Sequence, residues 1–439
     1  MSILEQLSDE ACWERFYDYK TALACPKTFA KELRRFIDAR GWEPVCEEIR
    51  GLVDARDWEP VCEEILQEIP FPLPSKAVIS KQSSQKKRTV YTYPAPENTV
   101  FKLLTWLLLR KYDGLFSDNL YSFRPGITAK DAVRRLRRTK NIGRMYSYKA
   151  DISNYFNSVP VEKLLPMLSE ALADDAELLS FLSGLLTEPR VVDGSRPHAP
   201  GSGRLHISDS DTSHAPGSGR IIIEQKGIMA GTPLSAFYAN LYLKELDRSF
   251  AERGIPYARY SDDIILFART AEERDACAAE VGRFLAERGL SMNPDKEVFG
   301  APEDGFTFLG FEFREGYIDI APVSVTKLKK KMRRKARALD RWHRRKGLSG
   351  EKAAAAFLRV FNRKLFAAEG DNELSWNRWF FPVITRADRL HEIDLYAQDC
   401  IRFLTAGTRT KARFDVRYED LKRLGYRSLV HEWYAYEGS

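Results

Sequence analysis

The sequence contains few histidines and no closely spaced pair of cysteines. Its six histidines are scattered and none of its six cysteines belongs to a CxxC pair, so a structural zinc site is not expected. No run of 18 apolar residues occurs, which argues against a membrane-spanning helix. The first 20 residues also lack the basic start and apolar middle of a secretory signal. These absences predict a cytoplasmic protein whose cysteines are reduced and mostly buried.

Basic residues are concentrated in one segment, although the net charge of +7 over 439 residues is modest. Between Lys327 and Lys346, twelve of twenty residues are Lys or Arg, against a single Asp. A solvated helix face is the usual explanation for a charged run. At this density, however, the segment repels itself unless phosphates or counterions neutralise it. The segment therefore predicts contact with nucleic acid.

Two direct repeats share an offset of 16 residues. DARGWEPVCEEI at 38–49 returns as DARDWEPVCEEI at 54–65, and HAPGSGR at 198–204 returns at 214–220. Two copies do not make a solenoid, and local duplication where insertion is tolerated explains them better. The Gly-, Ser- and Pro-rich stretch 192–220 predicts a long loop or hairpin tip.

The first 75 residues look helical, and the middle of the chain alternates predicted strands and helices. Apolar patterns predict strands at 146–151 and 306–320, a hairpin at 257–268, and helices over 164–186 and 233–250. A capping box at Thr270–Glu273 opens a further helix to about residue 287. This order suits a split βαβ, ferredoxin-like sheet.

Aspartates stand at the ends of two predicted strands. Asp151 lies in KADISNYFNSV (149–159), and Asp262 and Asp263 interrupt YARYSDDIILFA (257–268). Aspartate at such a place is often only a turn residue. Here the apolar run after Asp263 predicts a buried strand, beside which an unneutralised acidic pair is costly. A hard cation such as Mg²⁺ relieves that cost, and two such ions serve nucleotidyl transfer.

Six segments resemble the motifs of reverse transcriptases, in the order that this family shows. YSDD resembles its two-aspartate motif, and DISNYFNSV its first metal-binding motif. The others are YSFRPGITAKDAV (121–133) for the fingers, GIMAGTPLSAFYANLYLKELD (227–247) for template and nucleotide positioning, and LSMNPDKE (290–297) and FTFLGFEF (306–313) for the later palm. The resemblance covers roughly 86–313. It implies an α/β, right-hand polymerase fold with fingers, a ferredoxin-like palm and a helical thumb.

The resemblance also implies catalytic roles. Asp151 and Asp262 become the principal metal ligands, with Asp263 beside them and Ile152 in the same metal site. The ions are two Mg²⁺, with Mn²⁺ as a substitute. Lys296 falls near the leaving pyrophosphate as a general acid, although a solvated lysine is the alternative.

Substrate contacts follow from the same motifs. Phe156 falls where the family places a sugar-gating aromatic ring that would clash with a ribose 2′-OH; plain core packing is the alternative. Arg88 and Arg124 would contact the triphosphate, because Arg suits bidentate phosphate contacts. Gly231, Pro233 and Ser235 would shape the way in which the predicted 233–250 helix approaches the template and the nucleotide.

Two positions depart from the family pattern. Ser261 replaces the usual Ala of the two-aspartate motif, a small change that should be tolerated. Ala230 stands where the family commonly has a Gln that contacts the incoming nucleotide. Nucleotide choice or fidelity is therefore expected to differ.

The expected organisation is a helical extension (1–75), fingers and palm (76–320), and a basic, RNA-binding thumb (321–439). In the thumb, the aromatic-rich segments 376–386 and 417–434 predict either a helical core or stacking on RNA bases, with Trp376, Trp379 and Tyr426 as examples. The sequence has no HNH-like cluster of Cys and His, so an intron-type DNA endonuclease is not expected. The predicted RNA contacts are Lys330, Arg333, Arg334 and Arg337.

The resemblance implies an RNA-directed DNA polymerase that copies a structured non-coding RNA into cDNA from dNTPs. The short architecture resembles standalone bacterial, group II intron-like enzymes of the "unknown group", and its C-terminal pattern resembles defence-associated type 2 enzymes, which implies an antiphage role. One alternative is template-independent or protein-primed DNA synthesis. Another is an RNA-binding maturase or scaffold with idle catalysis, against which the intact Asp151, Asp262 and Asp263 argue.

Overall fold

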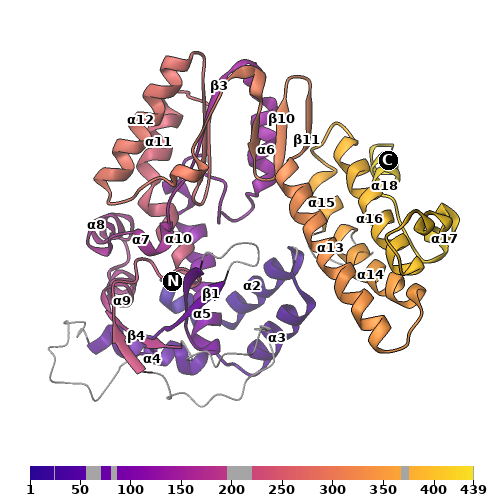
Figure 1. Ribbon diagram of the computed structural model, residues 1–439. Helices are drawn as coiled ribbons and strands as arrows, with labels where there is room; N and C mark the ends of the chain where they lie inside the picture. The colour runs from indigo at the N-terminus through magenta and orange to yellow at the C-terminus, as the bar shows by residue number, and fades with distance from the viewer. Residues whose placement is uncertain (24, 56–70, 81–86, 195–219, 367–374, 439) are drawn as a thin grey trace.

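The computed structural model describes residues 1–23, 25–55, 71–80, 87–194, 220–366 and 375–438. Figure 1 shows N-terminal helices with a small sheet, a second sheet backed by helices, and a group of C-terminal helices to one side. Most of the second copy of the 38–49 repeat and of the 192–220 segment lies outside the described residues. Within the described part of the chain, no helix is long and apolar enough to cross a membrane.

Four helices open the chain, as expected for its N-terminal part. Ser2 and Asp9 cap the first two, each accepting a hydrogen bond from a backbone N–H of the following turn. Trp13 and Trp42 are buried and stack with ring centroids 5.3 Å apart. These rings join the same hydrophobic core as the rest of the N-terminal half. The helices are α1 (Ile3–Leu7), α2 (Glu10–Ala22), α3 (Lys27–Asp38) and α4 (Glu43–Ala55).

A four-stranded sheet next to these helices has the order β2-β1-β4-β5. β1 pairs antiparallel with β2 and parallel with β4, and β4 pairs antiparallel with β5. β4 and β5 thus flank the 192–220 segment like the arms of a hairpin. The strands are β1 (Ser75–Ser80), β2 (Lys87–Thr92), β4 (Arg190–Asp193) and β5 (Arg220–Ile223).

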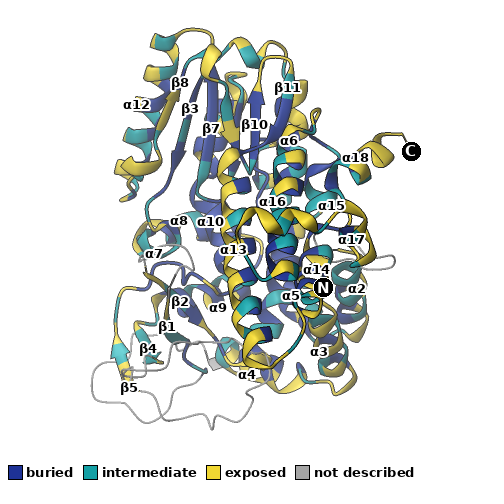
Figure 2. Ribbon diagram, turned by 45° about the vertical axis from the view of Figure 1, so that its right-hand side comes forward, coloured by how far each residue is buried: buried dark blue, intermediate teal, exposed yellow. Residues whose placement is uncertain are grey.

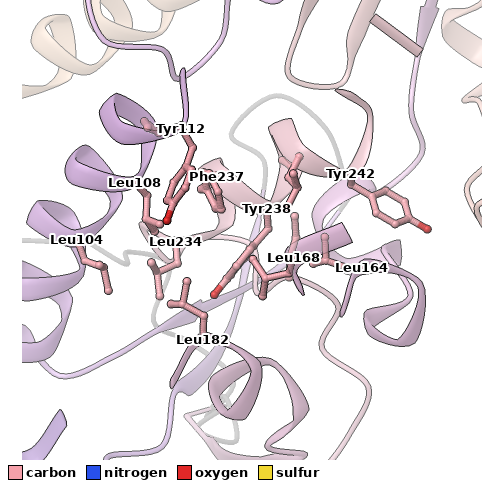
Figure 3. Packing of buried hydrophobic residues seen from close by; sticks show 14 of the residues in the cluster. Leu104, Leu108, Tyr112, Leu164, Leu168, Leu182, Leu234, Phe237, Tyr238 and Tyr242 are labelled. Carbon is pink, nitrogen blue, oxygen red and sulfur yellow. The ribbon is translucent and has the colours of Figure 1, made fainter. Parts of the chain in front are cut away.

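Helix α5 (Ala95–Lys111) is buried on nearly every side and lies at the centre of the first hydrophobic core. Figure 3 shows Leu108 of α5, Leu182 of α9 (Ala176–Thr187) and Phe237 converging in this core. Each fully buried side chain of this kind stabilises the fold by about 1.5–3 kcal/mol. The first hydrophobic core therefore packs α5 and α9 against the segment that contains Phe237, which precedes strands of the second sheet in the chain.

The second sheet has the order β6-β7-β3-β8, and all its pairings are antiparallel. Helices lie between β3 and β6, and α12 (Ala271–Glu287) lies between β7 and β8, which gives the βαββαβ order of a ferredoxin-like fold. The predicted palm is therefore confirmed. Its strands are β3 (Tyr146–Asp151), β6 (Tyr257–Tyr260), β7 (Asp263–Ala268) and β8 (Val298–Gly300).

Two predicted helices are each divided in the structure. The 164–186 pattern becomes α8 (Val161–Ala171) and α9, because Asp175 accepts a hydrogen bond from Leu178 N and starts a new helix. The 233–250 pattern becomes α10 (Ser235–Tyr242) and α11 (Lys244–Glu252), which meet at Leu243. Asp175 is a local N-cap signal for the first break, whereas no capping side chain marks the second break at Leu243.

The C-terminal third begins with a three-stranded sheet and continues as helices around a second core. Helix α13 buries Leu328, Met332 and Ala336 on one face and exposes its basic face, seen as a yellow band along α13 in Figure 2. The strands are β9 (Phe306–Phe308), β10 (Phe311–Arg314) and β11 (Tyr317–Ile320). The helices are α13 (Pro322–Arg345), α14 (Gly350–Leu365), α15 (Trp376–Phe380), α16 (Asp388–Ala406), α17 (Tyr418–Arg423) and α18 (Leu429–Glu437).

The aromatic side chains of α15 and the α17–α18 link belong to this second core. The ring of Trp376 lies 4.7 Å from that of Phe380, and the ring of Trp379 lies 5.9 Å from that of Phe311. Tyr426 is buried, and its hydroxyl accepts a hydrogen bond from Gln398 at 3.2 Å. Of the two alternatives, the structure favours core packing for these rings.

Asp319 of β11 connects this sheet to helix α16. Its carboxylate is buried and accepts hydrogen bonds from Ile320 N at 2.7 Å and from Arg389 N, in the first turn of α16, at 3.3 Å. Burial raises the pKa of Asp319 to about 6, against the lowering effect of these hydrogen bonds. Helix α16 is therefore attached to β11 through a carboxyl whose pKa is raised by burial to about 6.

Asp319→Asn should stabilise the protein more strongly as the pH rises from 5 to 8. The folded-state pKa of Asp319 is raised, so its contribution to stability is complete below the unfolded pKa and is lost as the pH rises through about 6. Asparagine keeps an acceptor oxygen and never ionises. We expect a difference of roughly 1–3 kcal/mol between the two pH limits, measured by denaturant unfolding. Asp415→Asn, at an exposed position, serves as the control; an equal effect of both substitutions would contradict the assignment.

Candidate active site

The three aspartates meet at one end of the palm sheet. Asp151 is the last residue of β3 and pairs in register with Asp263, the first residue of β7. Asp262 lies in the turn between β6 and β7, and its carbonyl accepts a hydrogen bond from Ile152 N at 3.1 Å. Strand register therefore brings together carboxylates more than 110 residues apart in sequence, with Ile152 beside them.

The turn that carries Asp262 is a two-residue hairpin loop with one strained residue. Tyr260 pairs with Asp263, so only Ser261 and Asp262 form the loop, and Ser261 has a positive φ of 60°. This conformation is unfavourable for a residue other than glycine and needs support from its surroundings. Ser122 supplies that support, because its Oγ accepts a hydrogen bond from Ser261 N at 2.9 Å. The side chain of Asn240 in turn donates to Ser122 O at 2.9 Å.

A buried ion pair between Arg259 and Asp247 contacts the same turn. Arg259 and Asp247 are both fully buried and form two hydrogen bonds, Nη2–Oδ2 at 2.6 Å and Nε–Oδ1 at 2.8 Å. Arg259 Nη1 also donates to Ser261 O at 3.2 Å. Removal of one partner would leave a buried charge, at a cost of about 3–5 kcal/mol. Our sequence analysis missed this pair, although a charged residue within the apolar strand 257–260 was an available signal.

Electrostatics at the strand ends favour a bound cation. Burial, followed by the charge of Asp151, raises the pKa of Asp262. Burial also raises the pKa of Asp263, while Lys149, with Nζ 3.9 Å from Asp263 Oδ1, opposes this effect. Lys296 Nζ lies 2.5 Å from Asp151 Oδ2, where it partly neutralises the group. Three carboxylates thus face Lys149, Lys296 and the charge of Arg88, and burial still raises the pKa of Asp262 and of Asp263, an effect that a bound cation would oppose.

These oxygen ligands fit magnesium. Among the residues that the structure describes, no three His, Cys, Asp or Glu side chains converge as a ready-made metal cage. Mg²⁺ in polymerase-type sites is typically held by one or two carboxylates together with substrate phosphates, so such a cage is not required. Asp151 and Asp262 are the carboxylates that would hold the ion.

Phe156 lies close to the aspartates, in the short helix α7 (Tyr155–Ser158) that follows β3. Its ring is half-buried and packs edge-on against Phe123, with centroids 6.3 Å apart, and against Tyr155 at 5.5 Å. Its carbonyl accepts a hydrogen bond from Ile228 N at 2.8 Å. The ring is therefore held in place beside the motif that begins at Gly227, and both its predicted roles stay open.

The two predicted triphosphate-binding arginines differ in their surroundings. Arg88 is exposed on β2, and its charge acts to lower the pKa of Asp262, so it faces the site. Arg124 is buried and bonds both oxygens of Asp113, each at 2.8 Å. Its contact with a triphosphate stays a prediction, one that requires the guanidinium to exchange Asp113 for phosphate.

The 227–235 segment is held against strand β2. Tyr91 N donates to Ala230 O at 2.8 Å, and a Cβ at Gly231 (φ 107°) would lie only 2.9 Å from Tyr91 O. Asn157, which the sequence did not single out, links β2 to the 227–235 segment. Its side-chain amide donates a hydrogen bond to Thr89 O of β2 and accepts one from Ala230 N. The predicted residues Pro233 and Ser235 follow at the start of α10, where Ser235 Oγ donates to Thr232 O at 2.6 Å.

The four predicted RNA contacts lie on a different element. All four side chains are exposed on α13, and none forms an ion pair with a described residue. They are available to external phosphates and are remote in sequence from the aspartates. They are Lys330, Arg333, Arg334 and Arg337.

A ferredoxin-like palm with three carboxylates at adjoining strand ends is the arrangement of a right-hand nucleic acid polymerase. The profile of the family "Reverse transcriptase (RNA-dependent DNA polymerase)" matches residues 79–313, more than half of the chain. The chain therefore belongs to the reverse transcriptase family, and its enzyme class is that of RNA-directed DNA polymerases, which are nucleotidyltransferases.

Solved structures with detectable similarity include telomerases of two yeasts. The Candida albicans telomerase in complex with a TWJ fragment of telomeric RNA is 12% identical, with a TM-score of 0.38 and coverage of 84% of this chain and 68% of that chain. Apo telomerase from Candida tropicalis is 10% identical, with a TM-score of 0.47 and coverage of 88% and 65%. Its form truncated from the C-terminal domain is also 10% identical, with a TM-score of 0.41 and coverage of 58% and 56%. Both matches to Candida tropicalis span less than two thirds of the telomerase chain. No curated protein matches the sequence.

Proposed function

We propose that this reverse transcriptase copies a bound, structured non-coding RNA into cDNA, with Asp151 and Asp262 holding two Mg²⁺ ions for which Mn²⁺ can substitute. The observation that carries the chemistry is the pairing of Asp151 with Asp263 in register, with Asp262 in the adjoining turn. The ions, when bound, would stabilise the attacking and leaving oxygens of nucleotidyl transfer. Lys296 Nζ, already beside Asp151, would donate a proton to the leaving pyrophosphate.

Phe156 is proposed as the residue that excludes ribonucleotides. Its ring is held between Tyr155 and Phe123 next to the metal-binding strand end. Arg88, exposed and facing the same carboxylates, would bind the triphosphate. Gly231 would keep the 227–235 segment directly against β2, because a side chain at that position would clash with Tyr91 O.

Phe156→Ala should raise the incorporation of ribonucleotides relative to deoxynucleotides roughly tenfold or more, because the steric clash with the 2′-OH disappears. The measurement is single-nucleotide extension of one primer–template with each dNTP and the matching rNTP. Phe156→Tyr keeps the bulk of the ring and should keep the wild-type ratio. An unchanged ratio in an active Phe156→Ala enzyme would assign the ring to packing alone.

The RNA partner is supported by the basic face of α13, where four exposed side chains form no ion pair with a described residue: Lys330, Arg333, Arg334 and Arg337. We accordingly propose 1–75 as a helical extension, 76–320 as fingers and palm, and 321–439 as an RNA-binding thumb. A cytoplasmic, antiphage role rests on the resemblance of the motifs to defence-associated enzymes. Phage challenge of cells that carry the wild-type or the Asp262→Ala gene tests that role; equal protection by both would contradict it.

Sequencing of the nucleic acid that copurifies with the protein tests the proposed function. We expect one enriched RNA and DNA complementary to it. DNA without complementarity to any RNA would instead show template-independent synthesis, and DNA attached to a tyrosine would show protein priming. RNA without any DNA product, in the presence of Mg²⁺ and dNTPs, would support a scaffold.

A further inference from the structure

A groove of about 600 Å³ opens on the thumb between α13, α14 and α17. Leu358 and Leu424 contribute apolar surface to it, and the half-buried ring of Trp342 lines one side. Lys352 and Arg359, both exposed, stand at its rim. An aromatic ring, an apolar floor and flexible cations suit a flat, anionic ligand segment.

The seam between α13 and α14 continues this groove with further positive charge. Lys331 and Lys335 precede Trp342 by 11 and 7 residues, so helical spacing places them along the same side of α13. Lys331 acts electrostatically on Lys364 of α14, whose pKa is lowered by burial and by this like charge. Two neighbouring lysines that repel each other favour an anion between them.

Acidic side chains of the described residues do not neutralise this surface. None of its five basic residues forms an ion pair within the described part of the chain; they are Lys331, Lys335, Lys352, Arg359 and Lys364. Glu351, next to the rim, is already paired with Arg423 at 3.4 Å. Charge complementarity therefore favours a polyanion over an apolar protein segment as the occupant.

We infer that the α13–α14 seam binds single-stranded RNA, with one unpaired base stacked on Trp342 and the adjoining phosphates beside Lys331, Lys364, Lys352 and Arg359. This inference rests on the proposed function, because it takes RNA as the partner. Stacking needs an unstacked base, so paired RNA cannot use the groove in this way. Trp342, like Trp376 and Trp379, is a half-buried ring packed against the second core, but of these three rings it is the one that lines the groove.

The test uses the full chain with Asp262→Ala, so that binding is measured without chemistry. A labelled 12-nucleotide RNA without self-complementarity, and the blunt duplex of the same sequence, are titrated by fluorescence anisotropy. Trp342→Leu should weaken binding of the single strand about tenfold and change binding of the duplex less than twofold. Trp379→Leu, which removes a half-buried ring that packs on Phe311 outside the groove, should leave both affinities unchanged.

A second variant covers the case in which Trp342→Leu does not fold. Lys352→Gln with Arg359→Gln changes only exposed side chains and should flatten the log–log salt dependence for the single strand by up to about 1.4. An unchanged slope, equal losses for Trp342→Leu and Trp379→Leu, or equal losses for single strand and duplex would each overturn the inference. Because the assay does not depend on polymerisation, its failure leaves dNTP incorporation by the wild type unaffected. Absent incorporation with intact Trp342-dependent binding would overturn the proposed function alone.

Discussion

Replacement of Asp262 and Asp263 by alanine should abolish Mg²⁺-dependent incorporation of dNTPs and leave the chain folded. The two carboxylates lie with Asp151 at one end of the palm sheet, and the loss of metal ligands removes several kcal/mol of transition-state stabilisation. Primer extension measures the effect. Asp118→Ala removes an exposed carboxylate elsewhere and should keep full activity. Undiminished incorporation by the folded double variant would contradict the site assignment.

The same substitution should raise the stability of the metal-free protein. Folding raises the pKa of Asp262 and of Asp263, so their contribution to stability is lost as the pH rises through these raised values. The double variant lacks both ionisable groups and therefore does not lose this stability at neutral pH. Without metal we expect its Tm to be about 2 °C higher than that of the wild type. The wild type should gain Tm on addition of Mg²⁺, whereas the variant should not. A difference in Tm that does not depend on pH would contradict this explanation.

The second large effect is expected on RNA affinity. When Lys330, Arg333, Arg334 and Arg337 are changed to Gln, the log–log salt dependence of RNA binding should flatten by up to about three units, since each phosphate contact contributes on the order of 0.7. Affinity should fall most at low salt and about equally for unrelated RNAs, because phosphates carry no sequence information. Titration at several salt concentrations measures both quantities.

A matched control removes four exposed charges from the palm instead of α13. The residues are Lys163, Arg248, Arg269 and Arg283, each to Gln. The control should change the salt dependence much less than the α13 variant. If both variants keep the wild-type slope, α13 is a solvated helix and the RNA path lies elsewhere.

The palm shows which parts of the fold local sequence predicts well. The strand 146–151 and the hairpin 257–268 occur with the expected bounds, because apolar runs interrupted by turn residues are a local signal. Thr270 caps α12 as expected, with its hydroxyl accepting from Glu273 N at 3.2 Å. By contrast, the helix break at Leu243 has no capping side chain that would mark it in the sequence.

The sequence by itself determined the strand ends that carry Asp151, Asp262 and Asp263, and the family to which their motifs belong. Only the tertiary structure decided what holds them in place. Ser261 is supported by Ser122 from 139 residues away, and Ser122 by Asn240 from 118 residues away. The physical reason is that an apolar pattern is set by near neighbours along the chain. A buried polar group instead requires a partner in space, and the folded chain can supply it from any distance in sequence.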